Sequence, residues 1–322
     1  MIKRNWAAGL ALTVSMLLSG VATAQNGTIK IIVGYPPGAT SDLLTRAIAD
    51  GMSKRLNQPV IVENKAGAGG QLGNLLVKAA PADGTTLLMT PVATMSIFPH
   101  SYGDQLKYDP FKDFAPVAHL SNFQIGFGLS NKVPASNLKE YVAWVKSAPA
   151  QNAFFGSAAP GSLPHFLGVL FAQSAGIKLE HVPYKGTAPA MQALAAGEIP
   201  ALSTVAADIQ SLVDSKRARL VAVAGEKRSP RFPDVPTFKE QGINLVASPW
   251  YALFAPVGTP PAVIQNLSKA AMDAVKDPSI HKKIIEMDLE PTGYGPDQLA
   301  QIMKSDYEKW GPPIRESGFK PQ

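Results

Sequence analysis

The fold is decided by the stretch IIVGYPPGATSDLLTRAIADGM, residues 31–52. An apolar run breaks at the turn Tyr35-Pro-Pro-Gly38, and from about Thr40 apolar residues recur at helical spacing. The pattern predicts a buried strand, a stiff turn and a helix. The first backbone N–H groups of a helix have no partner within it and carry partial positive charge. The turn is therefore expected to bind an anion through its backbone.

A carboxylate fits such a turn. Charge-assisted hydrogen bonds contribute about 1.5–3 kcal/mol each, so three or four could supply much of the roughly 8 kcal/mol of micromolar binding. The alternative is that a side chain of the turn caps the helix and solvent takes the remaining donors. The candidate contacts are Tyr35, Gly38, Ala39, Thr40, Ser41 and Asp42.

A second stretch, FFGSAAPGSLPHFLG at 154–168, repeats the order of strand, Gly/Ser turn and helix. If the two turns lie in different lobes, they can face each other across a cleft, and a dianion would bridge them. The candidate contacts in this second turn are Ser157, Ala158, Gly161, Ser162 and His165.

Two further loops could reach the same cleft. ENKAGAGGQLGN at 63–74 resembles a dinucleotide fingerprint, but its third glycine is at 73, one position too late. We expect a tight loop there instead, with Gly67 as a candidate contact. Lys185 ends an expected strand and is either a cleft residue or a solvated surface lysine. Trp250 and Tyr251 could stack on a planar ligand or fill a hinge.

The sequence gives little support for a catalytic site or a metal site. Ser157 lacks the flanking glycines of a nucleophile elbow, and Ser162 lies between Pro160 and Pro164. A secreted serine hydrolase using Ser157 or Ser162 with His165 remains the alternative function. The five histidines show no metal-ligand spacing, and there is no cysteine. We therefore predict no catalytic residue, no metal site and no cofactor.

The N-terminus is typical of an export signal. Lys3 and Arg4 precede an apolar stretch that ends near Val21, and the small residues Ala22-Thr23-Ala24 suit signal cleavage. A membrane anchor is the alternative, but the apolar stretch is shorter than the roughly 20 residues of a span. We expect residues 1–24 to be removed. Export without cysteine favours the bacterial periplasm.

The charge balance weakly favours anionic ligands. The chain has 30 basic and 24 acidic residues, a net charge of +6. The basic residues are scattered, without a stripe interleaved with aromatic residues, so no nucleic-acid partner is expected.

The rest of the sequence predicts an α/β fold. Short apolar runs alternate with helical stripes, which is typical of layers around a mainly parallel sheet. Residues 121–130 and 244–254 could both cross between lobes. Lobe 1 would then comprise 25–126 and 249–322, and lobe 2 would comprise 127–248, joined by a double crossover hinge. One continuous sheet with long loops is the alternative.

The chain resembles the Bug (TctC) family, the substrate-binding receptors of tripartite tricarboxylate transporters. The resemblance covers nearly all of the chain after residue 24. It is carried, in order, by VGYPPGATSD, VIVENKAGAGGQLG, APADGTTLL, FFGSAAPGSLPH, HVPYKGTAPAMQALAAGEI, EKRSPRFPDVPTFKEQG, FAPVGTPPAV and DYEKWG.

The resemblance implies a type II-like periplasmic binding protein, a two-lobed clamshell rather than an enzyme. Such a receptor closes on a small organic acid and delivers it to the membrane permease subunits of the transporter, and we expect it to be a monomer. Family ligands are held largely by backbone N–H groups and water from the first strand-helix loop of each lobe. These loops correspond here to Tyr35–Asp42 and Ser157–His165.

Two departures from the family pattern bear on the ligand. Ala39 replaces the second glycine of the usual P-P-G-G turn. The family often has G-x-x-D and a further Asp four residues later, where this chain has Pro200 and Thr204. An amino-acid ligand is therefore expected less than a di-, tri- or aromatic carboxylate, and Thr204 is a candidate contact.

Overall fold

The computed structural model describes residues 27–321, so the predicted signal peptide lies outside the described residues. The first part of the chain forms β1 (Ile29–Val33), α1 (Thr40–Leu56), β2 (Val60–Asn64), η1 (Ala68–Gly70), α2 (Gln71–Lys78), β3 (Thr86–Pro91), η2 (Ala93–Ile97), α3 (Phe98–Tyr102), η3 (Gly103–Gln105) and β4 (Phe114–Phe123). The middle part forms β5 (Ile125–Ser130), α4 (Leu138–Ser147), α5 (Pro149–Asn152), β6 (Phe154–Ser157), α6 (Leu163–Ser174), β7 (Glu180–Pro183), α7 (Thr187–Ala196), β8 (Ala201–Val205), η4 (Ala206–Ile209), α8 (Gln210–Asp214) and β9 (Ala218–Val223). The last part forms β10 (Trp250–Pro256), α9 (Pro261–Lys276), α10 (Pro278–Glu286), β11 (Leu289–Tyr294) and α11 (Pro296–Glu316).

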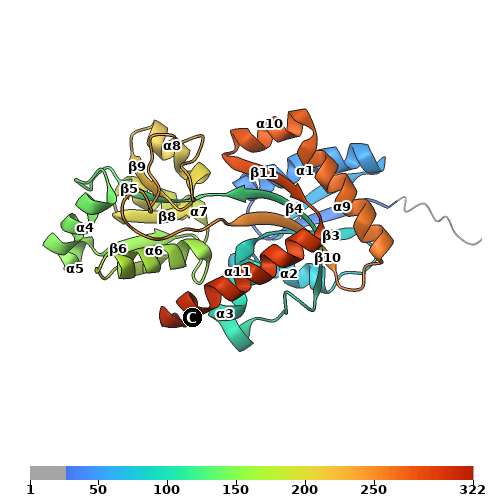
Figure 1. Cartoon of the computed structure of the whole chain (residues 1–322), viewed down its shortest axis with the longest axis horizontal. Coiled ribbons are helices and arrows are strands. Elements are labelled where there is room, and N and C mark those ends of the chain that lie inside the picture. The colour runs from blue at the N-terminus through green and yellow to red at the C-terminus, as the bar shows by residue number, and fades with distance from the viewer. Residues whose placement is uncertain (1–26, 322) are drawn as a thin grey trace, which may run out of the picture.

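These elements build two lobes, each around its own sheet (Figure 1). The first sheet has six strands in the order β11-β4-β10-β3-β1-β2, and the second has five in the order β7-β6-β8-β5-β9. The fold class predicted from the sequence, a two-lobed α/β clamshell, is confirmed.

Both predicted turns follow a strand that lies between two parallel neighbours. In the first lobe β1 pairs in parallel with β2 and β3, and only Lys30 of the strand is exposed. In the second lobe β6 pairs in parallel with β7 and β8. Ligands of open α/β sheets bind outside the carboxyl ends of such strands. The topology therefore puts each turn where a ligand site is expected.

The expectation of a mainly parallel sheet is wrong. β10 runs antiparallel to both β3 and β4, β11 runs antiparallel to β4, and β5 runs antiparallel to β8 and β9. Each of these antiparallel pairings involves β4, β5 or β10, the strands that flank the two crossings between the lobes. Hydrophobic periodicity reveals a strand but not the direction of its partner, so the sequence could not show this.

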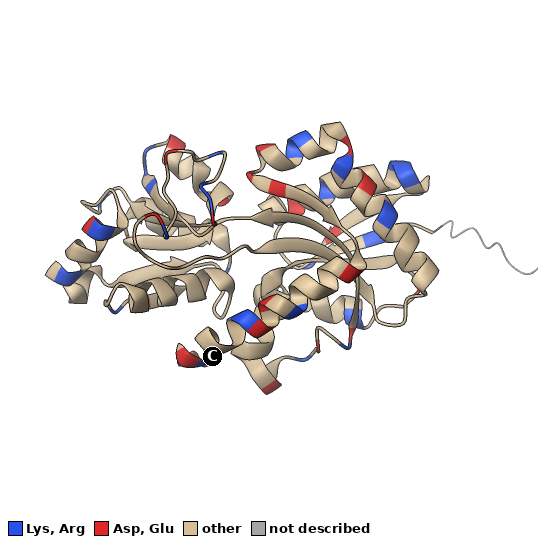
Figure 2. Cartoon of the chain, viewed as in Figure 1, with Lys and Arg blue, Asp and Glu red and all other residues tan. Residues whose placement is uncertain are grey.

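The chain passes between the lobes twice. β4 leads into β5 across Gln124, and the segment 224–249 returns the chain from β9 to β10. The strands β4, β5 and β10 contain no Asp, Glu, Lys or Arg, and the charged residues lie mainly on the helices and loops (Figure 2). Buried apolar side chains continue along them, from Ile31 through Tyr251 to Phe127. The predicted lobe boundaries at 126/127 and 248/249 stay predictions.

The C-terminal segment also joins the lobes. α11 runs toward the second lobe (Figure 1), and the ring of Phe319 lies 5.1 Å from His165 and 5.5 Å from Phe166 of α6. Across residues 27–321, none of the helices combines the length and apolar character needed to cross a bilayer.

The contact between α6 and β6 makes a stability prediction. A Cβ at Gly168 would lie 2.1 Å from a ring carbon of the buried Phe155. We expect Gly168→Ala to lower the free energy of unfolding by about 1–3 kcal/mol in denaturant titrations, despite the better helix propensity of alanine. Gly27→Ala is the control, since its Cβ would only reach a Thr85 methyl group at 3.8 Å. Equal stability of Gly168→Ala and the wild type would contradict this packing.

Candidate functional site

The first turn begins a helix without a capping side chain. α1 starts at Thr40, as predicted, and its N-cap Ala39 has extended backbone angles with no side-chain hydrogen bond. Gly38 has a φ of 84°, a left-handed conformation that suits glycine. The N–H groups of Ala39, Thr40 and Ser41 have no acceptor within the helix, because they precede its first complete turn. No acceptor for these three donors is found among the described residues.

Asp42 holds this turn in shape. Its Oδ2 accepts the Gly38 N–H at 2.9 Å, and its Oδ1 accepts the side-chain amide of Asn64 at 2.9 Å. Arg46 forms an ion pair with the same carboxylate at 3.0 Å. Although burial acts to raise the pKa of Asp42, hydrogen bonds from Arg46, Gly38 and Asn64 hold it below its usual value. The Asp42 carboxylate and the Gly38 N–H thus bind each other.

The second turn contains the same kind of hydrogen bond, from a glycine N–H to a side chain four residues later. The Gly161 N–H donates to His165 Nδ1 at 3.0 Å, as the Gly38 N–H donates to Asp42. The hydroxyl of Ser162, the N-cap of α6, donates to the Ala159 carbonyl at 2.6 Å instead of capping the helix. In each turn, the glycine N–H that the sequence offered to a ligand is taken by the protein itself.

Ser157 hydrogen-bonds to His181, a residue that sequence reasoning missed. The Oγ–Nε2 distance is 2.8 Å, and the ring of His181 stacks on that of His165 with centroids 3.9 Å apart. The predicted hydrolase alternative paired a serine with His165, whose Nδ1 instead accepts the Gly161 N–H. Ser157 is also fully buried, and its hydroxyl is already paired with His181. The geometry gives the hydrolase alternative no support.

The glycine loop 67–70 brings the two turns together. Tyr35 donates its hydroxyl to the Gly69 carbonyl at 2.9 Å, and burial raises the pKa of this phenol. A Cβ at Gly69 would lie 3.7 Å from the Cβ of Ala159 in the second turn. The carbonyl of Gly67 accepts the Gly70 N–H within the loop. The first turn, this loop and the second turn are therefore neighbours.

Further contacts close the lobes over this region. α3 of the first lobe donates two side-chain hydrogen bonds to the second turn, from Ser101 to the Gly161 carbonyl at 3.2 Å and from Tyr102 to the Pro160 carbonyl at 3.0 Å. The third contact runs from the Thr40 hydroxyl to Asp208 of the second lobe at 2.7 Å. Sequence reasoning missed Asp208, although it follows the end of β8 as the turns follow β1 and β6.

The remaining predicted contacts lie around the second turn. The Ala158 carbonyl accepts the Gly186 N–H at 3.0 Å, which fixes the loop that bears the exposed Lys185. Thr204 is buried in β8 opposite Gly126 of β5. Trp250 donates to Asp306, and Tyr251 stacks on Phe123, so both aromatic residues pack within the protein.

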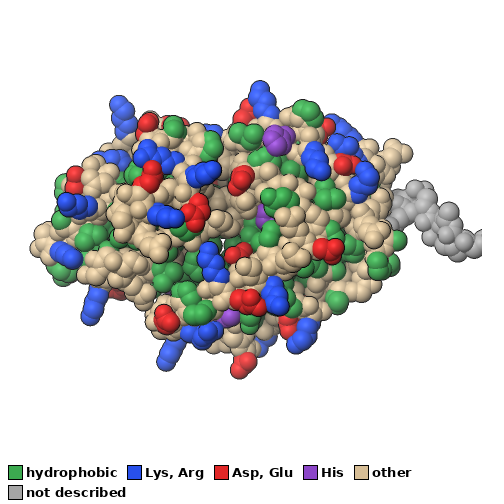
Figure 3. All heavy atoms as spheres, viewed as in Figure 1, with side chains coloured by type: hydrophobic (Ala, Val, Ile, Leu, Met, Phe, Trp, Pro, Cys, Tyr) green, Lys and Arg blue, Asp and Glu red, His purple; other side chains and the backbone are tan. Residues whose placement is uncertain are grey.

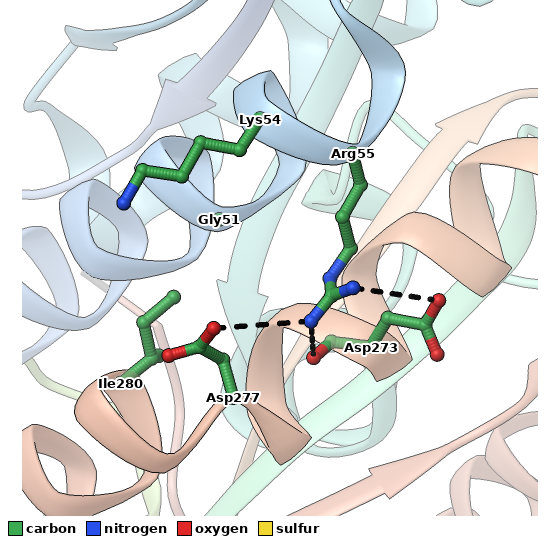
Figure 4. Close-up of a pocket in the computed structure, with 6 residues that line it drawn as sticks. All are labelled: Gly51, Lys54, Arg55, Asp273, Asp277 and Ile280. Atoms are coloured by element: carbon green, nitrogen blue, oxygen red, sulfur yellow. Dashed lines mark hydrogen bonds and ion pairs between the residues drawn. The ribbon is translucent and has the colours of Figure 1, made fainter.

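A hollow of about 410 Å³ lies elsewhere in the first lobe, between α1 and the segment of α9 and α10 (Figure 4). Arg55 points between Asp273 and Asp277, 3.9 Å from a carboxylate oxygen of each, so its charge is already balanced. Basic and acidic side chains also intersperse over the face of both lobes in Figure 3. Within residues 27–321, no three His, Cys, Asp or Glu side chains gather as metal ligands.

Two α/β lobes joined by two crossings define the class: a two-lobed periplasmic binding-protein fold. The family model for the tripartite tricarboxylate transporter family receptor, TctC, matches residues 44–319. The chain belongs to this family, which confirms the resemblance found in the sequence.

Individual relatives agree over nearly the full length. BugT of Bordetella pertussis is 32% identical over 299 residues, 91% of this chain and 90% of BugT. A structure of MatC from Rhodopseudomonas palustris with bound malate is 28% identical, with a TM-score of 0.81 over 89% of this chain and 98% of MatC. An R. palustris protein solved with adipate is 26% identical, with a TM-score of 0.86 over 92% of this chain and 98% of that protein.

The stacked histidines predict a loss of stability in acid. Burial lowers the pKa of His165 to about 3, helped by His181, and lowers that of His181 to about 4, against an ordinary 6.5. The unfolded chain therefore binds protons first, and stability present above pH 6.5 is lost as the pH falls toward these values. We expect urea titrations to show a loss of about 2 kcal/mol or more between about pH 7 and about pH 5.

His181→Gln tests this assignment, because glutamine keeps a hydrogen-bonding partner for Ser157 but does not titrate. The variant should show a shallower dependence of stability on pH, whatever its stability at neutral pH. An unchanged dependence would show that other groups cause the acid effect.

Proposed function

We propose that this receptor captures a small organic carboxylate between its lobes, at the turns 35–42 and 157–165, and delivers it to the permease subunits of a tripartite tricarboxylate-type transporter. The observation that carries the proposal is the start of α1, where three N–H groups lack helical acceptors and no side chain caps the helix. The second turn lies against the same region. A carboxylate there gains several charge-assisted hydrogen bonds without a basic side chain.

The ligand class follows from the site and from the relatives. A binding site between two lobes, with backbone donors at the start of α1, suits an acid with two or more separated carboxylates. Relatives have been solved with adipate and with malate, both of which are dicarboxylates. The proposed ligands are di-, tri- or aromatic carboxylates.

Binding, without catalysis, is the proposed activity. A ligand that touches both lobes binds the closed form better than an open form, so it shifts the population toward closure. The closed form is what the permease would recognise. The receptor would act in the periplasm as a monomer, without a cofactor.

A ligand screen tests the proposed function. At a concentration of about 100 times Kd, a bound acid stabilises the folded state by about 2.7 kcal/mol, which should raise the melting temperature by about 5 °C. We expect at least one acid from a panel of di-, tri- and aromatic carboxylates to do this in a thermal-shift assay. A fluorophosphonate probe should leave every serine unlabelled in mass spectrometry. Covalent labelling without any thermal shift would favour a hydrolase.

Ala39→Pro tests the backbone donors directly. Ala39 has a φ of −73°, which proline adopts, so the substitution removes one N–H with little change of backbone. Losing one charge-assisted hydrogen bond should weaken binding of the best acid about 10- to 100-fold by calorimetry. Gly295→Pro, at the N-cap of α11 with a φ of −78°, is the matched control and should bind normally. Normal binding by a folded Ala39→Pro would exclude this N–H as a ligand contact.

A further inference from the structure

Asp208 places a carboxylate at the start of two helices. It lies in the short helix η4 after β8 and is half-buried. Its Oδ1 accepts the hydroxyl of Thr40, the first residue of α1, and the side chain of Thr187, the first residue of α7, also hydrogen-bonds to it. α1 belongs to the first lobe and α7 to the second. The carboxylate therefore lies between the lobes, beside the N–H donors proposed for the ligand.

No basic side chain balances this carboxylate. Among the described residues Asp208 forms no ion pair, and its side-chain donors are the hydroxyls of Thr40 and Thr187. Lys185, two residues before Thr187, is exposed. Burial raises the pKa of Asp208. Burial also raises the pKa of Tyr251, and the charge of Asp208 adds to that shift. Asp42 differs, because Arg46 compensates it.

This arrangement discriminates between ligands by charge. A bare dicarboxylate at the start of α1 would bring a second anion close to Asp208 in a poorly solvated place, and like charges there repel. An ammonium group on the ligand would offset the repulsion and supply the missing positive charge beside Asp208. The oxygens of the Asp208 carboxylate have further lone pairs that can accept its hydrogens. Hydroxyl donors alone leave this acceptor capacity unused.

We propose that Asp208 is the specificity-determining residue of the site and selects organic acids that carry an ammonium group. The ligand carboxylate would bind the N–H groups at the start of α1, and its ammonium would bind Asp208. The inference rests on the proposed function and narrows its ligand class to amino acids. It replaces the expectation, drawn from Pro200 and Thr204, that an amino-acid ligand is disfavoured.

Matched ligand pairs test the proposal with the mature chain at neutral pH. The pairs are succinate with L-aspartate, glutarate with L-glutamate, and adipate with L-2-aminoadipate, each of which differs only by one ammonium group. For the pair of best-fitting length, we expect calorimetry to give at least tenfold tighter binding of the amino acid. Asp208→Asn keeps an acceptor for Thr40 and Thr187 but removes the charge, and should reduce this preference at least tenfold.

Asp214→Asn is the control, because it removes one exposed negative charge from the end of α8 in the same lobe. It should keep the wild-type preference. Asp208→Ser, which also removes the charge, serves as a second variant if Asp208→Asn does not fold.

The outcomes separate this inference from the proposed function. Equal or tighter wild-type binding of the plain diacids would overturn the role of Asp208 and leave the carboxylate receptor standing. A preference that survives in both Asp208 variants would also overturn it. Binding of no acid in the pairs or in the wider panel would overturn the proposed function and this inference with it.

Discussion

The structure depends on how the backbone N–H groups at the starts of α1 and α6 find acceptors. A helix start leaves several donors without partners, and burying them unpaired is costly. Both turns give one glycine N–H to a side chain four residues later, Asp42 in the first and His165 in the second. This bond holds each turn in place, and at the start of α1 the N–H groups of Ala39, Thr40 and Ser41 still lack a helical acceptor. The same bonds give Asp42 and His165, both predicted as ligand contacts, a role in holding the turns in shape.

The two sheets bring the turns that follow β1 and β6 close to each other. β1 and β6 are parallel strands in different sheets, so their following turns belong to different lobes. The uncharged strands β4, β5 and β10 connect the lobes and carry a continuous apolar core. Hydrogen bonds from Thr40, Ser101 and Tyr102 then close one lobe on the other at the turns. Under the proposed function, a ligand bound at the turns would change the relation between the lobes through this link.

The contact between the lobes contains a charged group of the protein, the carboxylate of Asp208. The turns contain no compensating cation for Asp208, whereas Asp42 has Arg46 and the outer hollow has Arg55 between two aspartates. An acid-binding site with an uncompensated carboxylate is a selective one, because its charge opposes some anions more than others. The buried pair of neutral histidines beside Ser157 adds no positive charge, since burial lowers the pKa of both.

The sequence by itself determined the α/β class, the position of α1 and α7, the two strand–turn–helix segments and the family. These features are local: strand and helix periods, Pro and Gly at turns, and short motifs in order. Only the tertiary structure decided that the connecting strands run antiparallel, that Ser157 pairs with His181, and that Asp208 meets Thr40. The physical reason is distance along the chain. Thr40 and Asp208 are separated by 168 residues, and no periodicity or spacing encodes a contact that arises when two lobes pack together.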